Sequence, residues 1–155
     1  MNIFALSSDP HTAALFHCDK HIVKMPLETA QMLCTVYGAG APYKPTHANH
    51  PCTVWARAST ENYRWLVQLG VSLCEEYTYR YHKTHKCQAI IESLSEPPAN
   101  VPVGERTPFA QAMPNECQHT DAVLAYQRYY AVHKQHLAAW KLRSRPYFMQ
   151  LEAAA

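Results

Sequence analysis

The fold is decided by residues 9–37, which read DPHTAALFHCDKHIVKMPLETAQMLCTVY. Asp9 is suited to cap a helix, and Pro10 fits the first helical position because that position needs no N–H donor. The helical pattern runs to Tyr37, where two glycines end it. Pro26 is expected to kink or divide the stretch, since its ring removes a donor and clashes one turn back.

A stripe of polar side chains follows this helical stretch. Residues three or four apart share one face of a helix, and four side chains keep that spacing: His21, Lys24, Glu28 and Gln31. The apolar residues lie mostly off the stripe: Ile22, Met25, Leu33 and Val36. Such a concentration of titratable groups, with a second polar cluster soon after it, indicates a reactive site.

The next segment adds two helical patterns. A short helical turn is expected at 53–58, after which Ser59 or Thr60 caps a long helix that ends near Tyr81. Thr84 then opens another short helix.

The rest of the chain is a long loop, a last helix and a tail. Residues 95–119 carry five prolines and no periodicity, so we expect an ordered loop there. Thr120 caps a final helix whose apolar stripe reaches Trp140. At the other end, residues 2–6 are apolar and form an edge strand or a segment docked on the core. The tail, 149–155, ends in a Leu-Glu-Ala-Ala-Ala sequence that is typical of a cloning remnant.

These elements predict an all-α fold, a compact single domain over residues 1–148 with about five helices and a long Pro-rich loop. Its 155 residues suffice to bury one core, and 48% hydrophobic against 17% charged residues is typical of a folded protein. Six cysteines without a CxxC pair, and no signal peptide, predict reduced thiols and a location in the cytoplasm of a bacterium or a phage-infected host. We expect a monomer. No apolar run approaches the roughly 20 residues of a membrane span, so no membrane partner is expected.

Glu28 is the candidate catalytic carboxylate. With Lys24 and His21 as catalytic partners, it could act as a general base or stabilise a cationic intermediate. The alternative is a simple Lys24–Glu28 ion pair at i,i+4, which contributes about 0.3–0.5 kcal/mol.

The second polar cluster runs from Tyr43 to Pro51. With neighbouring polar residues it supplies the candidate substrate-binding side chains, which are Gln31, His47, His50, Arg57 and Gln111. Gln111 either offers its amide to a base edge or belongs to a packed connector. No cofactor is predicted, although zinc is an alternative, because thiolate and imidazole are zinc ligands. That alternative set is Cys18, His21, His47 and His50.

Basic residues gather locally, although the net charge of +2 is too small to hold DNA by bulk charge. The run from Arg80 to Lys86 and the final helix interleave basic and aromatic residues, a pattern suited to phosphate contact and base stacking. The candidate DNA-contacting residues are Arg80, Lys83, Lys86, Lys134 and Lys141. The alternative is a solvated junction between helices.

The order of several motifs is informative over the first 86 residues. These motifs are the apolar N-terminus, Glu28, the Asn49-His50-Pro51 turn, Trp55, Arg57, Ala58, the helix end Glu76–Tyr81, Lys83 and Lys86. This order resembles the pyrimidine-dimer DNA glycosylase family of the phage endonuclease V type. The resemblance implies a small all-helical enzyme that flips a modified or damaged pyrimidine out of DNA and cleaves its N-glycosidic bond.

The resemblance also implies a nucleophile, the N-terminal α-amine, which forms a Schiff base after the initiator methionine is removed. This chain begins Met1-Asn2, and asparagine is bulky enough for Met1 to stay. We therefore expect the amine to be displaced, with Lys24 as its substitute, because a desolvated lysine can lose its proton.

Three alternatives remain open. The chain is also similar to uncharacterised phage proteins found near thymine-hypermodification genes, which implies a transferase that substitutes the exocyclic methylene of a modified thymine. A zinc-dependent hydrolase or a zinc-stabilised nucleic-acid-binding domain is the second alternative. A non-catalytic nucleic-acid adaptor is the third.

Overall fold

The computed structural model describes residues 1–152, and every regular element within them is helical. The α-helices are α1 (Pro10–Phe16), α2 (Asp19–Tyr37), α3 (Pro51–Ala58), α4 (Thr60–Tyr81), α5 (Gln88–Ser93) and α6 (Ala122–His133). Short 3₁₀ turns cover Asn115–Cys117, Gln135–Leu137 and Tyr147–Gln150. The predicted all-α class is confirmed. None of the helices in this part of the chain has the length and apolarity that a membrane crossing requires.

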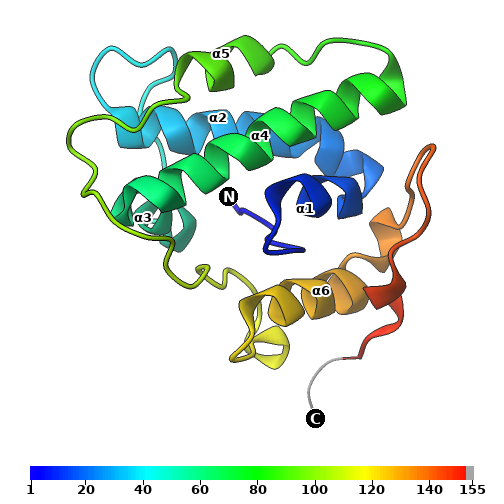
Figure 1. Cartoon of the computed structure of the whole chain (residues 1–155). Helices are drawn as coiled ribbons and strands as arrows, with labels where there is room; N and C mark the ends of the chain where they lie inside the picture. The colour runs from blue at the N-terminus through cyan, green and yellow to red at the C-terminus, as the bar shows by residue number, and fades with distance from the viewer. Residues whose placement is uncertain (153–155) are drawn as a thin grey trace.

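Helix α4 is the central element of the fold. It packs against α1, α2, α3 and α5, as Figure 1 shows. Gly70 permits the close approach of α2, because a Cβ at this position would lie 2.7 Å from Cγ2 of Thr29. The core on both sides of α4 is apolar, and the buried Tyr63 hydroxyl donates to the Leu94 carbonyl.

Three helix starts are capped by side chains, two of them as the sequence predicts. Asp9 accepts a hydrogen bond from the Thr12 N–H, and Ser59 accepts one from the Asn62 N–H, as predicted. At α3 the cap is His50, whose ring nitrogen accepts from the Cys52 N–H. These side chains satisfy N–H groups that the first helical turn leaves unbonded.

The division of the first helical stretch does not lie at Pro26. Helix α2 is continuous through this proline, and the break falls between Phe16 and Asp19 instead. The buried guanidinium of Arg80 donates to the carbonyls of Leu15 and His17, which the break leaves without helical partners. The break is therefore stabilised by a side chain more than sixty positions away, which local sequence patterns do not reveal.

The later helices differ from the sequence-based boundaries. Helix α5 begins at Gln88 and not at Thr84. Helix α6 is capped by Asp121, whose carboxylate accepts from two backbone N–H groups, and it ends at His133. Trp140 therefore lies beyond the helix, where its indole N–H donates to the Phe16 carbonyl.

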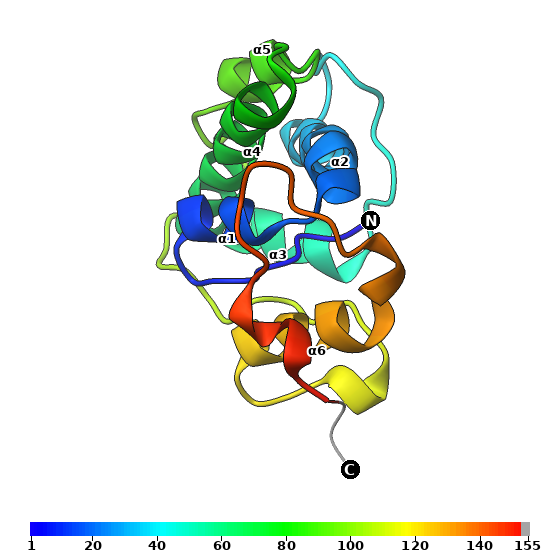
Figure 2. The same ribbon diagram turned by 90° about the vertical axis from the view of Figure 1, so that its right-hand side faces the viewer.

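The two ends of the described chain both belong to the packed structure. Residues 2–6 form no strand but a buried segment docked between helices. The segment 138–145 leaves α6 and passes over α1 towards α4, as Figure 2 shows. Met149, which falls in the expected tail, is buried, and its carbonyl accepts from Gln135. Residues 153–155 of that tail lie outside the described residues.

The cap of α6 is open to a direct test. Replacing Asp121 with alanine should lower the free energy of unfolding by about 1 kcal/mol, because two N–H groups lose their acceptor. Replacing the neighbouring, exposed Thr120 with alanine should leave it nearly unchanged. Urea unfolding of both variants measures the difference. Equal losses would show that Asp121 is not the cap.

Candidate active site

The centre of the site is an ion pair between the first residue of the chain and Glu28 of α2. The α-amine of Met1 lies 3.3 Å from Oε1 of Glu28, and Nζ of Lys24 lies 3.4 Å from Oε2 of the same carboxylate. Glu28 is buried, whereas 67% of the Lys24 side chain is exposed. The predicted Lys24–Glu28 pair is present. The buried oxygen of the carboxylate, Oε1, faces the Met1 amine and not Lys24.

One oxygen of the Glu28 carboxylate has no hydrogen-bond donor. This oxygen, Oε1, is buried and accepts no hydrogen bond, although the amine is within ion-pair distance. The Met1 side chain is buried while the residue as a whole is partly exposed, so solvent reaches the main chain that bears the amine. A carboxylate of this kind can accept a proton from the amine or stabilise positive charge beside it.

The amine is held in place through Asn2. The buried Asn2 side chain donates to the Ala112 carbonyl at 2.9 Å, and its oxygen accepts from the N–H groups of Ile3 and Phe4. The ordered loop that was predicted over residues 95–119 thus fixes the first residues of the chain. The expectation that retention of Met1 displaces the amine is wrong for this structure, because Met1 itself brings the amine to Glu28.

Helix α3 supplies a neighbouring wall through its cap, His50. Burial lowers the pKa of His50, the positive charges of the Met1 ammonium and His47 lower it further, and the Glu28 carboxylate acts in the opposite direction. His50 is half-buried, and His47 is exposed with a positive φ of 51°. His50 therefore lies close enough to the amine and to the Glu28 carboxylate for both charges to act on its ring.

His21 lies in the interior of the protein, two turns before Glu28 on α2. Its ring is buried, stacks on Phe4 with centroids 4.5 Å apart, and forms a 2.5 Å hydrogen bond with the Tyr130 hydroxyl. Burial, together with the charges of His17, Lys134, Lys24 and His136, lowers the pKa of His21 to about 3. His21 is therefore a neutral packing residue near neutral pH, which does not suit the acid–base role predicted for it.

The other predicted substrate-binding residues have distinct positions. Gln31 is half-buried one turn beyond Glu28. Arg57 donates to the Ala48 carbonyl and so holds the loop that carries the histidines. Gln111 exchanges two hydrogen bonds with the backbone of His119, so both ends of its amide serve the loop. Of the two alternatives given for Gln111, these hydrogen bonds favour the second, in which it belongs to a packed connector.

One of the five predicted DNA-contacting residues, Arg80, is buried. Arg80 is 0% exposed, and its guanidinium is bound by Glu76, Asp19 and two carbonyls, so its assignment as a DNA contact is wrong. The remaining lysines are exposed or half-exposed: Lys83, Lys86, Lys134 and Lys141. The charges of Lys134 and Lys24 both lower the pKa of His21, so both lysines lie near that ring.

A hollow of about 520 Å³ adjoins the site at Lys24. Lys24 and Lys86 both line it, together with the apolar surfaces of Leu27 and Tyr77. Of the four residues in the polar stripe, only Lys24 lines this hollow.

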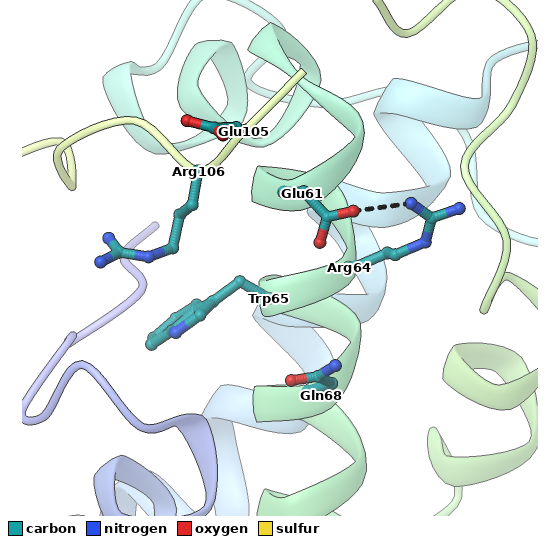
Figure 3. A pocket seen from close by; sticks show the side chains of 6 residues that line it. All are labelled: Glu61, Arg64, Trp65, Gln68, Glu105 and Arg106. Carbon is teal, nitrogen blue, oxygen red and sulfur yellow. Dashed lines mark hydrogen bonds and ion pairs between the residues drawn. The ribbon is translucent and has the colours of Figure 1, made fainter. Parts of the chain in front are cut away.

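A second hollow of about 360 Å³ lies on α4 and the loop before α6 (Figure 3). It shares no residue with the stripe. Its lining carries two carboxylates and two guanidinium groups, and Glu61 pairs with Arg64 at 2.8 Å. With its charges balanced, it has no bias toward an anionic ligand, and we do not include it in the site.

The alternative zinc set is not assembled. Across residues 1–152, no three His, Cys, Asp or Glu side chains are grouped as metal ligands. The Cys18 thiol accepts from the Tyr130 hydroxyl, which also bonds the His21 ring. The arrangement of Cys18 and His21 is therefore explained by hydrogen bonding to a tyrosine.

Sequence analysis missed three contributors to this site, namely the Met1 amine as actually placed, Phe4 and Tyr130. The resemblance does imply the first, an N-terminal amine, but Lys24 was expected in its place because Asn2 favours retention of Met1. The other two carry no local signal, since an apolar residue and a tyrosine on a helix are ordinary core residues.

The buried histidines predict acid sensitivity. Burial lowers the pKa of His17 to about 4 and that of His21 to about 3, from 6.5. The unfolded chain therefore takes up protons first as pH falls below about 6.5, and stability present above that pH is lost on acidification. For His17 alone the loss by pH 4 is about 3 kcal/mol.

Urea unfolding at pH 7, 5.5 and 4 measures this loss. His17→Gln should flatten the pH dependence, whereas His11→Gln, at an exposed position, should leave it unchanged. Parallel curves for the wild type and His17→Gln would assign the acid sensitivity to other groups.

Comparison with known proteins places this geometry in context. No curated protein and no solved structure matches the chain. The family model described as pyrimidine dimer DNA glycosylase matches residues 1–89, more than half of the 155 residues. The match includes Met1, Lys24, Glu28 and His50, while Ala112 and Tyr130 come from the chain beyond it. On this match, the chain belongs to the pyrimidine dimer DNA glycosylase family.

Proposed function

We propose that this DNA glycosylase removes a damaged pyrimidine with the α-amine of Met1 as its nucleophile and Glu28 as its catalytic carboxylate. The observation that carries the proposal is the 3.3 Å contact between the amine and a buried carboxylate oxygen that accepts no hydrogen bond. The family match supplies the substrate class, a pyrimidine dimer in DNA.

The chemistry follows from the two groups. Glu28 takes a proton from the ammonium, and the neutral amine attacks C1′ of the flipped nucleotide. The C1′–N1 bond breaks with its electron pair on the departing base, which takes the proton held by Glu28 and so restores the carboxylate. The C1′–O4′ bond of the sugar then breaks with its electron pair on O4′, which takes a proton from the attached amine. The product is an iminium, the protonated Schiff base, whose positive charge the Glu28 carboxylate stabilises.

Lys24 is the weaker candidate for the nucleophile. Lysine nucleophiles are desolvated or placed beside other cations, but two thirds of the Lys24 side chain is in water and its Nζ faces a carboxylate. We assign Lys24 to binding the DNA backbone, with Lys86 across the same hollow.

The amine and carboxylate roles are tested by trapping. Wild-type protein with dimer-containing DNA and borohydride should give a covalent protein–DNA adduct, because borohydride reduces an iminium to a stable amine. Glu28→Gln should keep the fold and lower the single-turnover rate at least ~100-fold. Glu75→Gln, an exposed residue of α4, is the matched control and should react normally.

The site of attachment separates the two amines. Tandem mass spectrometry should place the adduct on Met1, and Lys24→Met should still form it. An adduct on Lys24, or normal turnover by Glu28→Gln, would contradict the proposed roles.

The substrate is tested with three DNAs that carry pyrimidine dimers, hydroxymethyluracil or only ordinary bases, each followed by nucleoside mass spectrometry. We expect base release from the dimer-containing DNA. Conversion of the hydroxymethyluracil derivative without base release would favour the transferase alternative.

The lysines should determine how DNA affinity depends on salt. Replacing Lys24, Lys86 or Lys134 with glutamine should weaken binding to all sequences and reduce the salt slope by about one unit per lost phosphate contact. Arg64→Gln is the control, because Arg64 is paired with Glu61 outside the site. Titrations at several salt concentrations give the slope, and an unchanged slope in all three lysine variants would remove them from the DNA interface.

A further inference from the structure

The backbone of Phe4 has an unusual conformation close to the reactive amine. Its φ is 36°, in the left-handed region that bulky residues avoid. The N–H of Leu6 donates to the Phe4 carbonyl at 2.7 Å and closes a tight turn there. Such a conformation persists only when surrounding contacts hold it, and it occurs preferentially at functional sites.

The contacts that hold Phe4 come from two helices. Its ring stacks on His21 of α2 at 4.5 Å and on Tyr129 of α6 at 5.8 Å, with interplanar angles of 28° and 18°. Tyr130 and Tyr126 meet it edge-on. Phe4 as a residue is 5% exposed. We call Phe4, His21 and Tyr129 the aromatic clamp.

The clamp is connected to the amine by a short and rigid path. Only Asn2 and Ile3 lie between Phe4 and Met1, which carries the α-amine, and the Asn2 side-chain oxygen accepts from the N–H groups of both Ile3 and Phe4. Because Asn2 is also tied to Ala112, the first four residues have little freedom to move independently of the clamp.

We propose that Phe4 is a positioning residue, which fixes the Met1 amine beside Glu28 through the aromatic clamp. This inference rests on the proposed function for its catalytic consequence, but the placement of the amine can be measured separately. Without the stacked rings the backbone at position 4 would relax to negative φ, and the segment that ends in the amine would turn away from Glu28. A displacement of about 1 Å can cost on the order of 100-fold in rate.

The clamp also gives α6 a role in the site. Tyr129 lies beyond the residues that the family model matches, yet it forms the outer part of the clamp. It is half-buried, and the ammonium of Lys134 lies 5.0 Å from its ring. Because Tyr129 is not fully enclosed, it can be changed with less risk to folding than Phe4.

Four variants test the proposal. Phe4→Leu and Tyr129→Leu remove flat rings, Tyr129→Phe keeps the ring, and Tyr79→Leu removes an exposed tyrosine of α4 as a control. Both leucine variants of the clamp should lower the single-turnover rate at least ~10-fold with little change in DNA Kd. Tyr129→Phe and Tyr79→Leu should react as the wild type does.

A second measurement reports the amine directly. The α-amine of Met1 should react faster with a small acylating reagent in the two clamp variants than in the wild type, because it is released from Glu28. Tandem mass spectrometry locates the label, and thermal melting of each variant verifies the fold. If Phe4→Leu does not fold, the Tyr129 pair decides the matter.

The outcomes separate the two proposals. Wild-type labelling rates in both clamp variants, or equal losses in Tyr129→Phe and Tyr129→Leu, would overturn the positioning role. Faster labelling in the clamp variants of a protein that shows no activity on any DNA would support the clamp while rejecting the proposed function.

Discussion

The fold depends on one buried guanidinium group, that of Arg80, having an acceptor for its hydrogen bonds at every side. Arg80 sits inside the protein with no exposed surface, where an unpaired charge would be strongly destabilising. It bonds the end of α1, Asp19 at the start of α2, and Glu76 one turn back on α4. Glu76 in turn binds Arg143 of the C-terminal segment. Burial acts to raise the pKa of the Glu76 carboxyl, but the hydrogen bonds from Arg143 and Arg80 outweigh it and the pKa is lowered. One network thus joins the α1–α2 break to the last part of the chain.

This arrangement explains how a small helical protein builds a site from its own first residue. The break that Arg80 stabilises sets the direction of α2, which carries Lys24 and Glu28. The same C-terminal half that the network anchors provides α6 and the loop at Ala112, which hold residues 2–4 against α2. The amine and the carboxylate meet because residues 2–4 are packed between α2 on one side and α6 with the Ala112 loop on the other. The family match covers α2 but neither α6 nor that loop.

Prediction from sequence succeeded where the signal is local. Caps at Asp9 and Ser59, the stop after Tyr37 and the long α4 all depend on residues within one or two turns. It failed where a distant partner decides. The break fell at His17 because Arg80 bonds the freed carbonyls, and Pro26 stayed in a continuous helix. Arg80 in a basic run looked like a DNA contact, since charge patterns carry no information on burial. His21 occupies the polar stripe by spacing, yet its ring is buried under Phe4.

The sequence by itself determined the helical class, the starts of α1 and α4 and the presence of Glu28 beside Lys24, because these follow from helical periodicity and capping chemistry. It also carried the family resemblance over its first 86 residues. Only the tertiary structure decided which amine faces Glu28, which histidines are buried, and which basic residues are free to meet DNA. Each of these depends on contacts between segments far apart in the chain, such as Asn2 with Ala112 and Phe4 with Tyr129. Such contacts are fixed by packing of the whole core and leave no mark on the local pattern of either segment.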